Sequence, residues 1–309
     1  MKFLKITSIA SFIFFLSFGF SANSQELHGI LCGGEIRQAD MDVAAEFESA
    51  NPGVTIKWEA VPWGTCQDKV INLAIAGDPV DLAYVGSRTL KGLAENGHII
   101  NVDIPQSQIN MYQPGILNTV SHLGKVWGYP RAFSTKALFM NCDLLEEAGV
   151  ACEGPETWDE LYSMAEAVTN NVPGVAGIGL TGKDFDNTMH QFLNYLYSNG
   201  GQVIDPDTNT ITLNSSNTVE ALAFYGKLAN VAQEGPLAYE RSQLRDLLND
   251  KKIAMYIDGP WGRGTHNEDL NMKTVRIPAG PQGKQGTLLI TDSIAVFNNT
   301  GNEEMANKF

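Results

Sequence analysis

The sequence is poor in basic residues and in histidine. Its 309 residues include 21 Lys plus Arg against 35 Asp plus Glu, a net charge of −14, and 5 His. Nucleic-acid binding without sequence preference relies on basic patches that neutralise phosphate, so the acidic composition excludes that class. The histidines are scattered and no Cys-x-x-Cys pair occurs, so the sequence predicts no metal site.

Sequence motifs of the common enzyme classes are also absent. There is no H-E-x-x-H, no G-x-S-x-G and no Walker A motif. Residues 177–182 match G-x-G-x-x-G, but the run before them is short and already broken by glycine, so we interpret them as a strand end and a loop. Asp184 and Asp186 have no partner base and are expected to cap a loop. The sequence therefore predicts no cofactor and no enzymatic activity.

Long apolar runs are absent after the first 20 residues. Lys2 and Lys5 precede an apolar run at residues 6–20, and small residues follow at Ala22 and Ser24. At ~1.5 Å per residue, this run is too short to cross a hydrocarbon core of ~30 Å. The order predicts a cleaved secretory signal peptide over residues 1–24, with a signal-anchor helix as the alternative. We expect a soluble, monomeric, periplasmic protein.

Cysteine is rare, with four residues in the chain. Exported thiols usually meet an oxidising compartment, and four cysteines allow three pairings. Cys32 and Cys66 each follow a strand-like run, whereas Cys142 and Cys152 flank a short helical segment. We predict the disulfides Cys32–Cys66 and Cys142–Cys152, with four buried thiols as the alternative.

The sequence is rich in strand and helix signals, and these alternate along the chain. Strand-like runs at 27–31, 54–60 and 81–85 alternate with helical periodicity at 40–50, 66–76 and up to residue 96. This order is typical of a doubly wound α/β sheet, in which ligands bind beyond the carboxyl ends of the strands. A second series of strand signals lies at residues 137–140, 253–257 and 287–297. Helices are expected at 143–148, after Thr157, at 191–198, at 217–232, at 243–249 and from 302. Thr157 with Glu160 forms a capping box, and Asn217 with Glu220 is expected to cap the helix at 217–232.

Nine stretches of the chain occur in the same order and spacing in one protein family. They are residues 47–54, 76–85, 93–97, 128–130, 139–141, 145–150, 156–161, 252–261 and 278–281. On these stretches the chain resembles the sugar-type solute-binding proteins of ABC importers, family 1, the maltose-binding type. Members of that family are longer, so we expect the last part of the second lobe to be missing here.

This resemblance implies an α/β, two-lobe periplasmic-binding-protein-like fold of type II, with hinge strands near residues 131–134 and 289–292. Lobe I would be residues 25–131 plus 292–309, and lobe II residues 132–291. The implied function is capture of a carbohydrate (an oligosaccharide, sugar or polyol) between the lobes and its delivery to the membrane permease subunits of an ABC importer. Two alternatives remain, namely a polyamine or chelated metal on the same fold, and an exported glycosidase, for which no carboxylate pair stands out.

A carbohydrate site needs flat aromatic side chains for C–H faces and polar groups for hydroxyl edges. Trp261 follows Pro260 at a strand end, and Gly262 and Gly264 would leave room for a ligand, so we expect this indole to stack, with core packing as the alternative. Trp63 is the second aromatic candidate. The expected polar contacts lie at strand ends, at the hinges and on lobe II: Glu35, Ser87, Arg88, Arg131, Asp292, Asp186 and His190. For the arginines the alternatives are a solvated charge at Arg88 and an interlobe salt bridge at Arg131.

Overall fold

The computed structural model describes residues 24–205, 208 and 210–309, which form two compact α/β units. Among the described residues, unit 1 comprises residues 24–105, Ser121–Tyr129 and Ile294–Phe309, and unit 2 comprises Gln106–Val120 and the described part of Pro130–Ser293. Apart from Ser24, the predicted signal peptide lies outside the described residues. The chain crosses between the units within β6 (Tyr129–Ser134) and β13 (Ile290–Val296). Residues 106–120 group with unit 2, and the predicted lobe boundaries stay a prediction.

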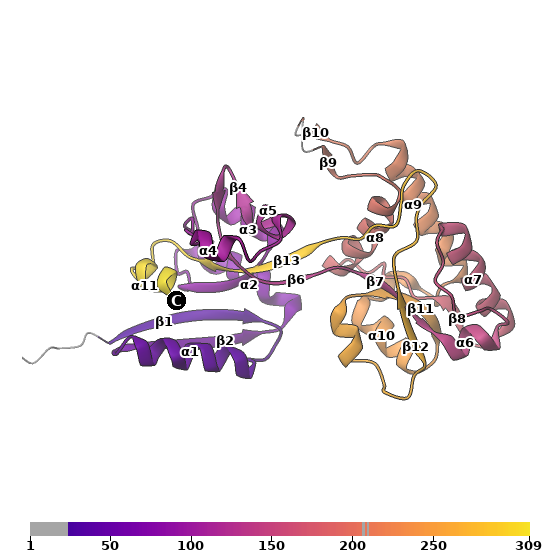
Figure 1. The fold of residues 1–309 in the computed structure, drawn as a ribbon, viewed down its shortest axis with the longest axis horizontal. Helices are drawn as coiled ribbons and strands as arrows, with labels where there is room; N and C mark the ends of the chain where they lie inside the picture. The colour runs from indigo at the N-terminus through magenta and orange to yellow at the C-terminus, as the bar shows by residue number, and fades with distance from the viewer. Residues whose placement is uncertain (1–23, 206–207, 209) are drawn as a thin grey trace, which may run out of the picture. The chain divides into compact units, whose positions relative to one another are not determined.

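Unit 1 is built on the parallel strands that the sequence predicts. Its elements are β1 (Gln25–Cys32), α1 (Gln38–Ala50), β2 (Val54–Val61), α2 (Trp63–Ala76), β3 (Leu82–Gly86), α3 (Ser87–Glu95), β4 (Ser121–His122), β5 (Lys125–Val126) and α11 (Glu303–Lys308). The sheet has the order β2-β1-β3-β13-β6, and β1 pairs in parallel with both β2 and β3. Helix α1 lies along β1 and β2 (Figure 1).

Because these strands are parallel, their carboxyl ends meet at one edge of the sheet of unit 1. The register pairs Cys32 with Val61 at the ends of β1 and β2. The predicted disulfide Cys32–Cys66 is present and joins the end of β1 to α2. The loop after β1, the start of α2 and the start of α3 therefore gather around this edge.

Unit 2 contains a mixed sheet with helices packed on it. Its elements are α4 (Gln106–Ile109), α5 (Pro114–Val120), β7 (Ala137–Asn141), α6 (Cys142–Glu147), α7 (Trp158–Asn171), β8 (Ala176–Ile178), α8 (Asp186–Ser198), β9 (Ile204–Asp205), β10 (Thr210–Ile211), α9 (Ser216–Leu228), α10 (Arg241–Asn249), β11 (Ile253–Asp258), β12 (Met272–Val275) and the 3₁₀ helices η1 (Ala229–Val231), η2 (Pro236–Ala238) and η3 (Pro260–Gly264). The strand order is β12-β7-β11-β8. The second predicted disulfide, Cys142–Cys152, is also present.

The register of the unit 2 sheet decides which residues meet at its edge. Strand β11 runs antiparallel to β7 and parallel to β8, and Asp258 pairs with Ala137. The last residue of β11 is therefore beside the first residue of β7. Residues just before β7 and just after β11 consequently lie close together, although about 120 positions separate them in the sequence.

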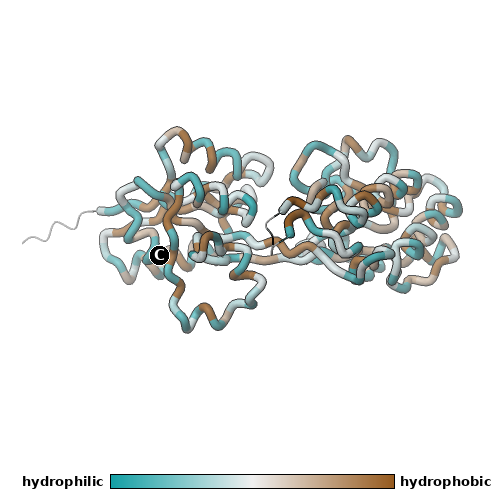
Figure 2. Tube along the Cα trace, turned by 90° about the horizontal axis from the view of Figure 1, so that it is seen from above, coloured by the Kyte–Doolittle hydropathy of each residue, from teal (hydrophilic) through white to brown (hydrophobic). Residues whose placement is uncertain are grey.

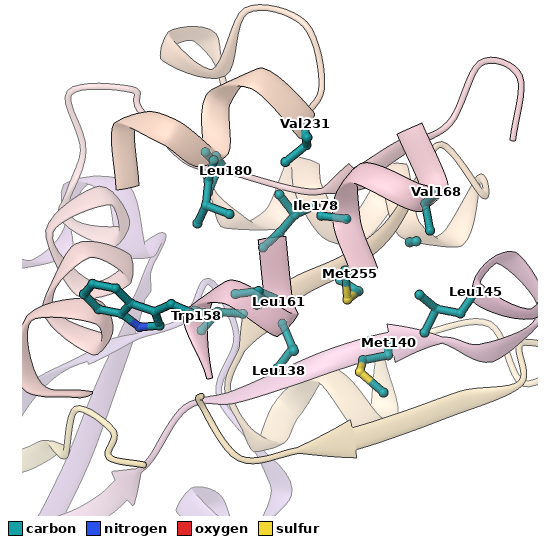
Figure 3. Packing of buried hydrophobic residues seen from close by; sticks show 14 of the residues in the cluster. Leu138, Met140, Leu145, Trp158, Leu161, Val168, Ile178, Leu180, Val231 and Met255 are labelled. Carbon is teal, nitrogen blue, oxygen red and sulfur yellow. The ribbon is translucent and has the colours of Figure 1, made fainter. Parts of the chain in front are cut away.

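The core of unit 2 lies between the sheet and helices α6, α7 and α9. Figure 3 shows Met255 and Met140 from neighbouring strands, with Leu161 of α7 close to Leu138 of β7. Trp158 stacks on Phe224 with ring centroids 4.4 Å apart. Hydrophilic and hydrophobic stretches alternate along the chain in both units (Figure 2), as expected for elements that bury one face.

The helix caps of unit 2 agree with the sequence at one position and differ at another. The predicted capping box of Thr157 and Glu160 is present at the start of α7. The prediction for α9 is wrong, because Ser215 caps this helix by accepting from the Thr218 N–H. Asn217 is used elsewhere, since its side-chain Nδ2 donates to the Asn199 carbonyl at 2.8 Å. Ser215 and Asn217 are both good cap residues by type. They differ in the structure because Asn217 makes the long-range contact with Asn199.

The glycine pattern at residues 177–182 is explained by packing. A Cβ at Gly177 would overlap the Ala165 carbonyl of α7, and one at Gly179 would lie 2.6 Å from the Ile253 side chain. These glycines let a helix and a strand approach β8 closely. The interpretation as a strand end and loop therefore has a structural reason.

Candidate functional site

In unit 1, an exposed indole lies at the edge where the parallel strands end. Trp63 is the first residue of α2 and is 48% exposed. It meets Tyr84 of β3 edge to face, with ring centroids 5.3 Å apart. A Cβ at Gly33 would lie 3.8 Å from the Trp63 Nε1, so the ring lies beside the end of β1. Its edge-on packing on Tyr84 leaves nearly half of Trp63 open to solvent.

Beneath Trp63, covalent and neutral polar contacts tie three elements together. The disulfide links Cys32 of β1 to Cys66 of α2. The buried Gln67 donates from Nε2 to the Tyr84 carbonyl at 3.1 Å and accepts the Gly86 N–H at 3.0 Å. We call Trp63, Tyr84, Gln67 and this disulfide the Trp63 platform.

The sequence-predicted polar residues of unit 1 lie around the same strand ends. Ser87 and Arg88 are the first residues of α3 and directly follow Gly86, whose N–H the Gln67 side chain holds. Ser87 is half-buried and Arg88 is exposed. Glu35 is exposed in the loop after β1. The three residues thus follow the ends of β1 and β3.

In unit 2, a second exposed indole follows strand β11. Trp261 lies in η3 and is 39% exposed. A Cβ at Gly259 would overlap its ring, so Gly259 is the glycine that this conformation requires. The prediction for Gly262 is wrong, because Gly262 is buried and a Cβ there would lie 2.9 Å from the Phe139 ring. Gly262 therefore serves packing, whereas Gly264 has open space beside its Cα.

A fully buried carboxylate holds Trp261 in place. Asp258, 0% exposed, accepts on Oδ1 from the Trp261 Nε1 at 2.6 Å, the Gly259 N–H at 2.7 Å and the Arg241 guanidinium at 2.8 Å. Its Oδ2 accepts from the Tyr256 hydroxyl at 2.7 Å. Burial, and next the charge of Asp258, raise the pKa of Tyr256, so this hydroxyl is a neutral donor. Four donors occupy the carboxylate, which therefore positions the indole.

Two cations lie over the Trp261 ring. The Lys136 ammonium is 4.0 Å from the ring centroid and the Arg241 guanidinium carbon is 5.0 Å from it. Both distances are typical of cation–π contacts. An ammonium at this distance covers one face of the ring, so at most one face is left for another group. We call Trp261, Asp258, Arg241 and Lys136 the Trp261 platform.

Lys136 reaches this platform because of the sheet register. It directly precedes β7, whose first residue pairs with Asp258, so its backbone lies at the end of β11. The Lys136 N–H donates to the Thr287 Oγ1 at 2.8 Å and its carbonyl accepts from the same hydroxyl at 2.9 Å. Burial lowers the pKa of Lys136 to about 8, and the nearby positive charge of Arg241 acts in the same direction.

The remaining candidates of unit 2 lie on three elements. Asp186 begins α8, and His190 one turn later has its Nε2 3.6 Å from the Asp186 Oδ1. Asp292 is half-buried in β13. The charges of Asp186 and Asp292, like that of Asp258, act to raise the pKa of Lys136. Arg131 is exposed in β6.

Sequence reasoning missed Gln67, Lys136, Arg241 and Asp258. A local signal existed for Asp258, because a carboxylate that ends a fully buried strand must find donors. A weaker one existed for Gln67, a polar residue on the buried face of α2. Lys136 and Arg241 had none, because their contacts come from the tertiary fold.

Other features of the described residues do not add a second site. An open groove beside α9 has no aromatic residue among those that line it, which are Asn214, Ser216, Asn217, Val219, Glu220, Ala223 and Gln282. Between residues 24 and 309, outside the gaps named above, no group of three or more His, Cys, Asp or Glu side chains is arranged to hold a metal ion. In the same part of the chain, no helix combines the length and the apolar character needed to span a membrane.

Comparison with known proteins identifies the family. The sequence profile of the bacterial extracellular solute-binding proteins matches residues 33–309, so the chain belongs to this family. A binding protein of Brucella abortus is 31% identical over 278 residues, which cover 86% of this chain and 66% of the relative. The maltodextrin-binding protein of Bacillus subtilis is 27% identical over 68% of this chain and 50% of its own length. The chain thus spans 66% of the length of the Brucella protein and half of the Bacillus protein.

Solved structures show the same fold. The solute-binding protein of Thermotoga lettingae with bound α-D-tagatose has a TM-score of 0.77 at 24% identity, over 92% of this chain and 76% of that chain. The maltose-bound MalE3 of T. maritima has the same TM-score at 21% identity, over 92% and 75%. The predicted fold class, a two-lobe α/β binding protein of type II, is confirmed.

Proposed function

We propose that this protein captures a carbohydrate and delivers it to the permease subunits of an ABC importer. The observation that carries the proposal is Trp261, an exposed indole at a strand end whose N–H is bound to the fully buried Asp258. A pre-positioned aromatic face suits the C–H face of a sugar, and burying that face is worth on the order of 1–3 kcal/mol at ~25 cal/mol/Å².

Relatives support the choice of ligand class. The neighbours named above contain tagatose and maltose, another contains D-mannitol, and the Bacillus relative is named for maltodextrin. The proposed contacts are Trp261, Lys136, Asp186, His190, Asp292 and Arg131 in unit 2, with Trp63, Glu35, Ser87 and Arg88 in unit 1. That one ligand touches both groups is part of the proposal and rests on the likeness to this family.

The finer parts of the proposal concern location and assembly. The signal peptide would direct export and would be cleaved before Gln25. The mature protein would act as a monomer in the periplasm. The family description as extracellular and the order of residues 1–24 support this location. The mass of the exported protein tests the cleavage site.

A cationic ligand such as a polyamine is less compatible with this site. Lys136 and Arg241 already lie over Trp261, so a further cation there would be repelled. We also propose that the bound carbohydrate is released unchanged, because a glycosidase needs two carboxylates at a fixed separation across the scissile bond. The buried Asp258 is occupied by four donors and does not supply one.

Isothermal titration calorimetry with maltose, D-tagatose, D-mannitol, spermidine and Zn²⁺-citrate tests the ligand class. We expect at least one of the three carbohydrates to bind and neither control ligand to do so. A reducing-sugar assay after long incubation with maltose should show no release. Binding of spermidine or Zn²⁺-citrate alone would replace the carbohydrate proposal, and steady sugar release that survives repurification would make the protein an enzyme.

A further inference from the structure

The Lys136 side chain is buried, and its ammonium lies over the exposed indole of Trp261. The residue is 7% exposed, and none of the described residues gives its Nζ a hydrogen bond or an ion pair. Its Nζ lies 4.0 Å from the centroid of the Trp261 ring. An ammonium has three donor hydrogens, and a desolvated charge is costly unless it is paired. Lys136 therefore has unused hydrogen-bonding capacity at the exposed indole.

The other charged groups around Lys136 do not use this capacity. Asp258 of β11 is occupied by Arg241, Trp261, Tyr256 and a backbone N–H. Asp186 of α8, which is close to His190, and Asp292 of β13 act on Lys136 through their charge. Arg241 of α10 repels the ammonium. The three carboxylates favour the charged form of Lys136, and Arg241 opposes it.

We propose that Lys136 determines carbohydrate specificity at the Trp261 platform, by donating a hydrogen bond to a ligand oxygen at the edge of the sugar that contacts the indole. The inference rests on the proposed function and names one residue and one kind of ligand atom within it. The ligand oxygen supplies the acceptor that the described protein residues lack. A ligand with an oxygen at this place is preferred over one with hydrogen there, because the latter leaves the ammonium unpaired.

Such a hydrogen bond couples ligand binding to protonation. The free protein has a Lys136 pKa of about 8, whereas an ammonium that donates to the ligand is stabilised and its pKa rises toward the ordinary value of 10.5. If it reaches that value, binding takes up about 0.1 proton at pH 7 and about 0.9 proton at pH 9. The affinity should fall roughly tenfold between these two pH values, since at pH 9 only about one protein in ten is already protonated.

The test is calorimetric titration at pH 7 and pH 9, each in two buffers of different ionisation enthalpy, which gives the number of protons taken up per ligand. The probe is whichever of maltose, D-tagatose and D-mannitol binds most tightly. Lys136→Met is expected to weaken binding at pH 7 at least fivefold and to abolish proton uptake at pH 9. Lys136→Arg keeps a donor and a charge that does not titrate in this range, so it should bind without uptake.

A matched control is available in the same unit. The Lys227 ammonium lies 4.0 Å from the centroid of the Tyr162 ring, the same distance as in the Lys136 contact, but Lys227 is exposed on α9. Lys227→Met should leave both the affinity and the proton uptake unchanged. Melting temperatures of all variants show whether each one is folded.

Three outcomes are distinguishable. Proton uptake at pH 9 in the parent protein that is absent in both Lys136 variants supports the inference. Carbohydrate binding with no uptake at pH 9 overturns it and leaves the proposed function standing; Lys136 would then only hold the indole. Failure of all three carbohydrates to bind the folded parent protein overturns the proposed function, and this inference with it.

Discussion

The two exposed indoles have similar surroundings in the sheet and different supports. Trp63 and Trp261 both follow the end of a strand, and each carries a proline directly before it. The Trp63 platform is held by a disulfide and by the neutral amide of Gln67. The Trp261 platform is held by a buried carboxylate that binds a guanidinium and the indole itself.

This difference teaches that the same surface feature can depend on different chemistry underneath. Covalent and neutral contacts are insensitive to pH, but the disulfide among them is lost on reduction. A buried ionic arrangement tolerates reduction but fails when one partner is removed, because the other charge is then left unpaired. Substitutions and reduction should therefore separate the two platforms.

The largest effect is expected for Asp258→Ala. This substitution removes the acceptor of Arg241 and of the Trp261 N–H. Losing one partner of a buried ion pair costs ~3–5 kcal/mol, so the free energy of unfolding should fall by about that much and carbohydrate binding should be lost. Urea unfolding measures it. The control Asp246→Ala breaks the exposed pair with Arg245 and should change stability by no more than ~0.5 kcal/mol. Equal small losses in both variants would contradict the role of Asp258.

Removal of either disulfide should lower the free energy of unfolding, but only removal of Cys32–Cys66 should also weaken carbohydrate binding. The cysteines are 34 residues apart in Cys32–Cys66 and 10 apart in Cys142–Cys152. Chain entropy predicts stability losses of about 4 and about 3 kcal/mol on replacing each pair by alanine. The Cys32–Cys66 variant should also bind carbohydrate roughly fivefold or more weakly, about 1 kcal/mol, because the Trp63 platform loosens.

The Cys142–Cys152 variant is the control for this comparison, since its bridge spans α6 and none of the candidate contacts. Calorimetry at a temperature where both variants are folded measures the affinities. Equal affinities in the two variants would remove the disulfide from the support of the Trp63 platform.

A smaller effect is expected for Trp63→Ala. Nearly half of this side chain is exposed, so the free energy of unfolding should change by less than ~1 kcal/mol. Loss of its contact area should weaken carbohydrate binding about three- to tenfold. Trp63→Phe keeps an aromatic face and should recover most of the affinity. An unchanged affinity in Trp63→Ala would leave the Trp261 platform as the sole aromatic contact in this account.

Much of the fold could be predicted from the sequence, and less of the site. Strands β1, β2, β3, β7 and β11 have local signals, namely apolar runs, alternation and flanking glycine, and all were predicted. Both disulfides were predicted from local signals, since Cys32 and Cys66 each follow a strand-like run and Cys142 and Cys152 flank a short helical segment. The position of Trp261 after a strand was also readable, because Gly259-Pro260 interrupts the chain there.

The supports of the site are contacts between distant positions, and no local period encodes them. Lys136 lies 125 positions before Trp261 and meets it because Asp258 pairs with Ala137 in the sheet. The choice of Ser215 over Asn217 as a cap depends in the same way on Asn199. Gly262 was assigned to ligand access because the sequence does not reveal Phe139 beside it.

The most direct test of the central claim is the affinity of Trp261→Ala for the best-binding carbohydrate, measured together with the melting temperature of the ligand-free variant. The claim predicts binding weakened about 5- to 150-fold, the equivalent of ~1–3 kcal/mol, with little change in melting temperature. The control Trp158→Ala removes a buried indole that stacks on Phe224 and should cost ~3–5 kcal/mol of stability. A large drop in the melting temperature of Trp261→Ala with near-parental affinity at low temperature would contradict the claim.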